Sequence, residues 1–258
     1  MKLTKTFSYD NGAHFALLSE MAYKKSEKEF RKEIQNRGYN YDVKYFDIDG
    51  AQCYGLTDSD SIIFAFRGTE PDTFNDVQAD LKVFPVKDGP EGLDARIHRG
   101  FKDEVDTLWK PITKWLKENG KNKQVYTCGH SLGGAMSGIC ASRIDGSICY
   151  NYGCPRIGTN KWGKLFNKNH TMYRFVNDRD IVPRIPPAWM RYKHVGDLFH
   201  INKDGNKITK NPGPWNQFKT GCMNMVKNPL RITQGVSDHD MSEYRRYIEN
   251  WSKVVKEV

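Results

Sequence analysis

The sequence predicts an α/β fold in which a mostly parallel central sheet is covered by helices on both faces. Two observations lead to this prediction. Strand and helix patterns alternate along residues 124–176, which is typical of parallel strands connected by helices. The segment Ser61–Phe66 is a nearly continuous apolar run bounded by turn residues, as expected of a strand buried on both faces.

The elements before residue 100 are predicted from local patterns. Residues 13–23 are rich in helix-forming residues, and their apolar positions recur at helical spacing. Two strand patterns at 43–48 and 52–56 flank Asp49-Gly50. This dipeptide is a strong signal for a two-residue hairpin turn.

The elements after residue 100 follow the alternating pattern. An amphipathic helix over 101–118 ends at Asn119-Gly120, with a kink expected at Pro111. We then expect strands at 124–128, 148–152 and 171–176, helices at 132–143 and 161–167, and a final helix from about 241 to 253. Residues 201–237 are rich in Asn, Lys, Gly and Pro, which predicts a long surface excursion.

Length and composition favour a single globular domain over residues 1–258. The chain has 258 residues, of which 38% are hydrophobic and 12% aromatic, so it can form one large core. The 22 glycines and 11 prolines show no period, which excludes collagen-like and repeat architectures. The longest apolar run, Ile62–Phe66, is far too short to span a membrane.

The positive charge is concentrated in the second half of the chain. Residues 1–130 hold 20 basic and 21 acidic residues, whereas residues 131–258 hold 20 basic and 10 acidic residues. Such asymmetry suits a surface that contacts anionic lipid or nucleic acid, and it equally suits a solvated basic face.

The amino terminus predicts a cytoplasmic location, because no apolar core of a signal peptide follows its first lysines. Without a signal, the six cysteines are expected to be reduced thiols. None of them forms a CxxC pair, and Cys149 and Cys154 fall within or beside a strand pattern. We therefore expect no metal site.

Gly129-His130-Ser131-Leu132-Gly133 matches the G-x-S-x-G pattern directly between a predicted strand and a predicted helix. In that context the glycines permit a sharp turn that presents the serine hydroxyl above the sheet edge, facing the helix N-terminus. Ser131 is therefore the candidate nucleophile. The alternative is an ordinary helix N-cap in a glycine-rich turn.

Several further motifs accompany this pattern in order along the chain. They are Phe66-Arg67-Gly68-Thr69, Ile97-His98-Arg99-Gly100-Phe101, the run from Gly129 to Ala135, Tyr152-Gly153-Cys154-Pro155-Arg156-Ile157-Gly158, the run from Val176 to Pro183, and Asp238-His239. With these motifs the chain resembles the class 3 lipase family, a branch of the α/β-hydrolases. The resemblance covers most of the chain from about residue 13 and implies the α/β-hydrolase fold.

The resemblance also implies the partners of Ser131. In this fold the catalytic residues follow the order serine, acid, histidine, and His239 is the histidine in the family's Asp-His context. Both Asp178 and Asp180 follow a predicted strand, and their spacing alone cannot choose between them. The family's pattern assigns the acid to Asp180. It assigns the oxyanion hole to Thr69 and to Leu132, the residue after the nucleophile.

Two segments bear on the substrate. Residues 70–86 occupy the position of the family's lid and have the pattern of a short amphipathic helix, which either opens or packs permanently on the core. Residues 185–190 carry apolar surface that either lines an acyl groove or joins the core. In residues 203–231 cations alternate with aromatic residues, which suits an anionic lipid surface, nucleic acid or a solvated loop.

We therefore predict a serine carboxylic-ester hydrolase that cleaves acylglycerols through an acyl-enzyme and needs no cofactor. Phospholipase A1 and a soluble esterase are the alternatives within the enzyme class. A catalytically silent scaffold that binds anionic membrane or nucleic acid is the alternative outside it. The expected partner is a lipid or small ester, with peripheral contact to anionic lipid and no nucleic acid.

Overall fold

The computed structural model of the protein describes residues 2–69, 84–89, 94–178, 180–213 and 239–256. The main sheet contains β1 (Asp42–Ile48), β2 (Ala51–Thr57), β3 (Ser61–Phe66), β6 (Gln124–His130), β7 (Ile148–Tyr152), β9 (Thr171–Asn177), β11 (Asp197–Ile201) and β12 (Ile208–Lys210). A smaller sheet contains β4 (Pro85–Lys87), β5 (Arg96–His98), β8 (Gly158–Thr159) and β10 (Tyr192–Lys193). The helices are α1 (Tyr9–Met21), α2 (Glu27–Asn36), α4 (Arg99–Asn119), α5 (Leu132–Ser142), α6 (Asn160–Asn169) and α9 (Met241–Lys256), with short 3-10 turns at η2 (Val182–Arg184) and η3 (Ala188–Met190).

The main sheet is parallel in its centre and antiparallel at its edges. Its strand order is β1-β2-β3-β6-β7-β9-β11-β12. The neighbours from β3 to β11 pair in parallel, whereas β1, β2 and β12 join through antiparallel pairs. This arrangement confirms the predicted mostly parallel sheet.

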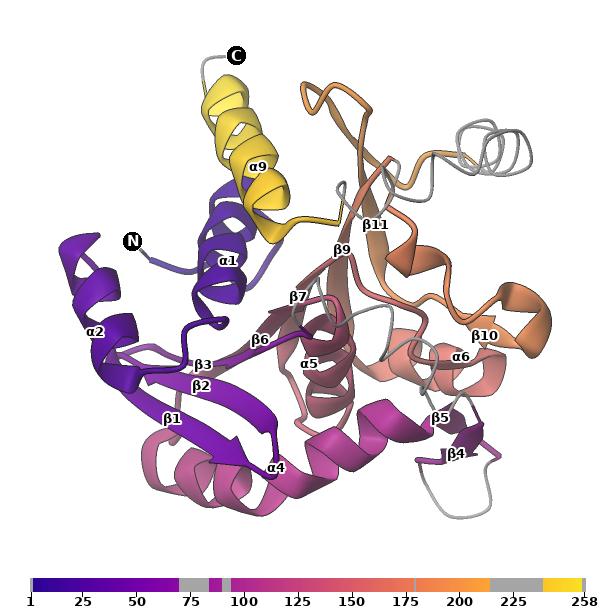
Figure 1. Cartoon of the computed structure of the whole chain (residues 1–258), viewed down its shortest axis with the longest axis horizontal. Coiled ribbons are helices and arrows are strands. Elements are labelled where there is room, and N and C mark those ends of the chain that lie inside the picture. Colours follow the sequence, from indigo (N-terminus) through magenta and orange to yellow (C-terminus); the bar gives the residue numbers. More distant parts are fainter. Residues whose placement is uncertain (1, 70–83, 90–93, 179, 214–238, 257–258) are drawn as a thin grey trace.

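Different helices cover the two faces of the main sheet, as Figure 1 shows. Side chains of α1, α2 and α9 form a core on one face, and side chains of α4, α5 and α6 form a core on the other. Successive residues of β3 alternate between these cores, with Ile63 and Ala65 in the first and Ile62 and Phe64 in the second. Because both faces of β3 are buried, its whole sequence is apolar after Ser61.

The hairpin and the long helix form where the sequence predicts them. Asp49 and Gly50 have φ angles of 50° and 87°, which is the turn geometry that matches the twist of two antiparallel strands. α4 begins where the ring of His98 accepts a hydrogen bond from the amide of Phe101, and its C-cap is Gly120. The helix continues through Pro111 without a break.

The prediction of a long excursion from residue 201 is wrong at its start. β11 extends the parallel sheet beside β9, and β12 pairs with β11, so residues 197–210 belong to the main sheet. No pattern in the sequence predicts the smaller sheet, whose strands are two or three residues long. Strands this short have too few residues to display an alternating pattern.

The helix α2 is a second element that the sequence pattern does not reveal. Its residues are mostly charged, and it buries only Phe30 and Ile34, which lie one helical turn apart. The side chain of Ser26 caps its amino end by accepting a hydrogen bond from the amide of Glu29.

Among the described residues, no helix combines the length and the apolar character needed to cross a membrane.

Candidate active site

Ser131 lies on a sharp turn between β6 and α5. Its backbone angles are φ 57° and ψ −127°, a conformation that costs non-glycine residues of order 1–3 kcal/mol and is concentrated at functional sites. The residue is fully buried, and its hydroxyl oxygen has no hydrogen-bond partner in the described part of the chain. Ser131 is the N-cap residue of α5, so it lies at the helix end where the dipole favours negative charge.

Two glycines allow this turn to pack against its neighbours. A β-carbon at Gly133 would come within 2.3 Å of the carbonyl oxygen of Phe66, and one at Gly129 would come within 2.3 Å of the backbone of Gly133. Both contacts are with backbone atoms, which cannot move aside cheaply. The glycine positions of the G-x-S-x-G pattern are thus required by close approach of β3, β6 and α5.

His239 and Asp180 form a buried hydrogen-bonded pair. Nδ1 of His239 lies 2.8 Å from Oδ2 of Asp180, and the two residues are 4% and 1% exposed. The other carboxylate oxygen, Oδ1, accepts a hydrogen bond from the amide of Val182 at 2.8 Å. The carboxylate therefore fixes the orientation of the imidazole ring.

Tyr244 adds a third contact to Asp180. Its hydroxyl donates a hydrogen bond to Oδ2 of Asp180 at 2.6 Å and accepts one from the amide of Asn177 at 2.9 Å. Tyr244 lies in α9, five residues after His239, and is fully buried. No motif in the sequence indicates this residue, because a buried tyrosine in an amphipathic helix is ordinarily a core residue.

The glycine at position 153 makes room for the pair. Gly153 follows β7 and has a φ of 56°, and a β-carbon there would lie 2.7 Å from Oδ2 of Asp180 and 2.9 Å from Nδ1 of His239. This position therefore requires glycine for both its backbone conformation and its space.

The ring of His239 also packs against the residue that precedes Ser131. The rings of His130 and His239 have centroids 4.3 Å apart. Nδ1 of His130 lies 2.8 Å from the hydroxyl of Tyr23. Burial lowers the pKa of His130 well below its usual range, and His239 lowers it further. His130 is therefore a neutral ring that supports His239.

The structure separates the two candidate acids. Asp178 lies 3.1 Å from Nε2 of His200, at the end of β9, whereas Asp180 contacts His239. Asp180 is thus the carboxylate that lies beside the candidate base, as the resemblance implies.

Thr69 and Leu132 line the same pocket. This pocket has a volume of about 320 Å³ and is lined by both residues, by the β1–β2 turn and by Arg67 and Glu104. Gly68 packs closely against the turn before Ser131, since a β-carbon there would lie 2.6 Å from the carbonyl oxygen of His130. The two candidate oxyanion residues therefore line one pocket, and Ser131 is not among the residues that line it.

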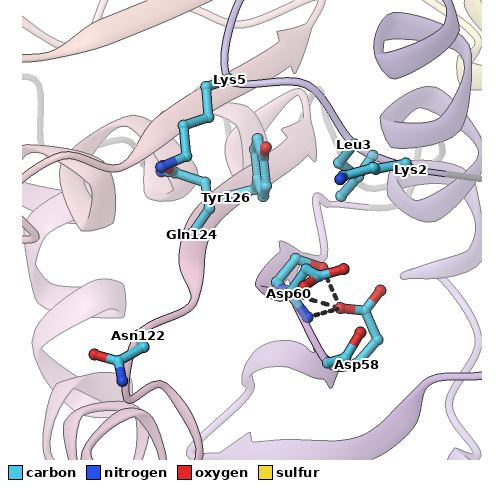
Figure 2. Close-up of a pocket in the computed structure, with 10 residues that line it drawn as sticks. Lys2, Leu3, Lys5, Asp58, Asp60, Asn122, Gln124 and Tyr126 are labelled. Carbon is cyan, nitrogen blue, oxygen red and sulfur yellow. Dashed lines mark hydrogen bonds between the residues drawn. The ribbon is translucent and has the colours of Figure 1, made fainter.

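A larger pocket, of about 490 Å³, lies at the other edge of the sheet (Figure 2). It includes Ser61 and Gln124, the first residues of β3 and β6, whereas Ser131 follows the last residue of β6. Oδ1 of Asp58 accepts hydrogen bonds there from the amides of Asp60 and Ser61. Its polar groups stabilise a turn, and the pocket contains no predicted site residue.

Other predicted features have different outcomes. Most of the candidate lid and most of residues 203–231 lie outside the described residues. In the apolar segment 185–190, Pro186 is buried, whereas Trp189 is 81% exposed and lies outside the core. Five cysteines, at positions 53, 128, 140, 149 and 154, are buried free thiols, and Cys222 lies outside the described residues. The described part of the chain contains no group of three His, Cys, Asp or Glu residues suited to a metal ion.

Comparison with known proteins gives a family and several relatives. The model of the family "Lipase (class 3)" matches residues 63–190. Toxin TseL of Vibrio cholerae is 38% identical over 41% of this chain and 17% of its own length. Secreted mono- and diacylglycerol lipase LIP1 of Malassezia globosa is 34% identical over 50% of this chain and 44% of its own length. A lipase of Rhizomucor miehei is 31% identical over 56% of this chain and 43% of its own length. The chain thus spans less than half the length of these three relatives.

Solved structures confirm the predicted α/β-hydrolase fold. The triacylglyceride lipase of Rhizomucor miehei superposes with a TM-score of 0.64 at 24% identity, covering 78% of this chain and 83% of its own. A mutant form of MDLA of Penicillium cyclopium superposes with a TM-score of 0.65 at 20% identity, and the match covers 81% of this chain and 89% of the MDLA chain. A further similar structure is described as a triacylglycerol lipase whose catalytic centre is a serine protease triad.

The comparison also corrects one prediction. Two Malassezia globosa relatives are named as secreted lipases, so the expected cytoplasmic location is wrong, and the relatives point to an extracellular one. The prediction failed because it depended on the absence of a signal pattern at the amino terminus.

Proposed function

Because the chain belongs to the class 3 lipase family, we propose that it is a serine ester hydrolase of the lipase type that cleaves acylglycerol esters. The buried hydrogen bond between His239 and Asp180 beside the Ser131 turn carries this proposal. Relatives named as mono- and diacylglycerol lipases support the choice of substrate. We further propose that residues 1–258 form one domain and that the protein contacts lipid surfaces peripherally.

The reaction follows from the roles of these groups. His239 accepts the proton of the Ser131 hydroxyl as the serine oxygen attacks the ester carbonyl carbon. Negative charge then develops on the carbonyl oxygen, where the amides of Thr69 and Leu132 and the hydroxyl of Thr69 donate hydrogen bonds. Asp180 stabilises the imidazolium that has formed.

The intermediate collapses to an acyl-enzyme. The protonated His239 gives its proton to the leaving alcohol, and the carbon–oxygen bond to that alcohol breaks. A water molecule then loses a proton to His239 and attacks the acyl carbon. The bond between this carbon and the Ser131 oxygen breaks, and His239 returns its proton to that oxygen, which releases the fatty acid and restores the Ser131 hydroxyl.

A series of esters tests the proposal. The parent protein and Ser131→Ala are compared on mono-, di- and triacylglycerols, on short soluble esters and on phospholipid vesicles. Ser137→Ala is the matched control, because Ser137 is a buried serine of the same helix whose hydroxyl bonds only within the protein. We expect acylglycerol hydrolysis that Ser131→Ala abolishes and Ser137→Ala retains.

Other outcomes would contradict part or all of the proposal. A preference for the sn-1 ester of phospholipids would indicate a phospholipase A1, and a preference for short soluble esters would indicate an esterase. The absence of any activity that depends on Ser131 would contradict the hydrolase itself and favour a binding scaffold.

A further inference from the structure

The segment between β9 and β10 combines an exposed aromatic side chain with unbalanced positive charge. Trp189, in the turn η3, is 81% exposed. Residues 181–196 include Arg184, Arg191 and Lys193 and no acidic residue, and the acidic residues earlier in the segment, Asp178 and Asp180, lie beside His200 and His239. Arg191 and Lys193 are exposed. A large aromatic side chain this exposed loses the favourable free energy of burial, so its surroundings need explanation.

Trp189 is held on an ordered support. The side chain of Arg156 donates hydrogen bonds to the carbonyl oxygens of Arg184 and Pro186. The backbone amide of Arg156 donates a hydrogen bond to the carbonyl oxygen of Ile185 at 2.7 Å. The turn itself closes with a hydrogen bond from the amide of Met190 to the carbonyl oxygen of Pro187 at 3.0 Å. Hydrogen bonds therefore hold the backbone on both sides of Trp189.

The smaller sheet brings more cations to the same end of the molecule. Its strand order is β10-β8-β5-β4. Tyr192 pairs with Thr159, the Thr159 hydroxyl oxygen accepts from the amide of Arg96, and Arg96 pairs with Lys87. This row runs from the residue after Arg191 to Lys87, whereas Lys193 lies in the adjacent row, whose side chains take the opposite face of the sheet.

A second exposed lysine, Lys161, follows β8 directly in α6. The positive charge of Arg96, Lys161 and Lys87 lowers the pKa of the Asp94 carboxyl, with the Arg96 hydrogen bond as the largest cause. One carboxylate is thus surrounded by three cations.

We propose that this surface anchors the protein to anionic lipid. We define the Trp189 patch as Trp189 with the exposed cations Arg191 and Lys193, which follow it within four residues. Tryptophan prefers the boundary between headgroups and acyl chains. Each cation near an anionic surface strengthens binding roughly fivefold. A membrane with negative headgroups satisfies both requirements, because it offers an apolar layer beneath a negative surface.

The position of the patch relates it to the candidate active site. The segment that carries Trp189 includes Asp180, and the amide of Val182 donates a hydrogen bond directly to that carboxylate. Docking of the patch would hold the carboxyl edge of the main sheet close to the lipid. The inference rests on the proposed function only for the choice of lipid as partner.

The test measures vesicle binding in the Ser131→Ala background, so that lipid is not consumed. Vesicles of phosphatidylcholine alone are compared with vesicles that also contain phosphatidylserine. The variants are Trp189→Ala and the pair Arg191→Gln with Lys193→Gln. The control is Lys28→Gln with Lys32→Gln, which removes two exposed lysines of α2. Figure 1 shows α2 at the side of the molecule opposite β10.

We expect binding to the anionic vesicles that weakens as salt rises. Trp189→Ala should weaken it roughly tenfold, and loss of Arg191 and Lys193 should weaken it about 25-fold, while the α2 control matches the parent. Tryptophan emission should shift to the blue on binding, and Trp189→Ala should lose most of this shift.

Two results would overturn the inference. One is binding of Trp189→Ala with unchanged affinity and an unchanged emission shift. The other is an α2 control that weakens binding as much as the loss of Arg191 and Lys193. Because turnover is absent from every arm, failure of hydrolysis elsewhere would contradict the proposed function and leave this test unaffected.

Discussion

At the scale of single residues, Asp180 is the most constrained group of the candidate site. Its two oxygens accept hydrogen bonds from Val182 and Tyr244 and contact His239. Each donor stabilises the ionised carboxylate, which in turn stabilises the imidazolium formed during catalysis. In the proposed mechanism, Tyr244 is thus a positioning residue that acts through Asp180.

We predict that Tyr244→Phe lowers kcat/KM about tenfold or more, since a hydrogen bond to a charged group contributes about 1.5–3 kcal/mol. Asp180→Asn should lower kcat far further, by roughly 10,000-fold, because the imidazole loses the partner that fixes its tautomer. Both variants are measured on a soluble short-chain ester. Full activity of Tyr244→Phe would show that this hydroxyl has no part in positioning Asp180.

A second residue prediction concerns the oxyanion site. Thr69→Val removes the hydroxyl donor and should lower kcat about 100- to 1,000-fold, whereas Thr69→Ser should retain most of the activity. Steady-state kinetics on the same ester measures this difference. Equal rates for the two variants would contradict the role of the Thr69 hydroxyl.

The residues that carry chemistry could be predicted better than those that support them. Ser131 was indicated by its own motif, and the structure brings His239 and Asp180 together as the resemblance implies. Their catalytic roles remain predictions. Tyr244 and the pairing of His130 with Tyr23 were not predicted, because these contacts join residues more than 60 positions apart.

At the scale of elements, the turn between β6 and α5 depends on close packing, whereas the turn between β1 and β2 depends on conformation alone. Gly133→Ala should destabilise the protein by several kcal/mol, since its β-carbon would overlap the backbone of Phe66 and Arg67. Gly50→Ala is the comparison, because nothing lies within 4 Å of its β-carbon. Its positive φ should cost about 1–2 kcal/mol.

Urea unfolding of both variants measures these costs. A smaller loss for Gly133→Ala than for Gly50→Ala would contradict the close packing at the serine turn. The elements themselves were predicted where a strong local signal existed, as at Asp49-Gly50. β12 and the strands of the smaller sheet were missed because pairing with distant strands, and not local pattern, makes them strands.

At the scale of the whole molecule, buried histidines on both sides of the main sheet link stability to pH. Burial lowers the pKa of His14 and of His98 to about 4. An unfolded histidine has a pKa of about 6.5. Between these values the unfolded chain binds protons that the folded chain does not, so the stabilisation is complete above about pH 6.5 and is lost as pH falls toward 4.

We predict that the free energy of unfolding falls between pH 7.5 and pH 5, and that each of these histidines contributes about 2 kcal/mol to the fall. His98→Asn removes the titration and retains a side-chain acceptor for the amide of Phe101. Urea unfolding at both pH values should show a smaller fall for this variant. An equal fall in parent and variant would contradict the buried neutral state of His98.

The fold class and its two-sided helical cover were predictable, because alternation of elements and a fully apolar strand are local signals of a parallel sheet. The strand order was not predictable, since it depends on tertiary pairing. The location was predicted wrongly, because the names of relatives and the amino-terminal pattern disagree. A single domain over residues 1–258 stays a prediction.

Covalent trapping tests the central claim most directly, namely that Ser131 is the nucleophile of an ester hydrolase. The protein is treated with an alkyl phosphonate ester, which phosphonylates activated serines, and the modified peptide is identified by mass spectrometry while residual ester hydrolysis is followed. We predict one adduct per chain, on Ser131, with activity lost in proportion to labelling and no adduct in Ser131→Ala. Hydrolysis that persists after full labelling, or an adduct on another residue, would contradict the account.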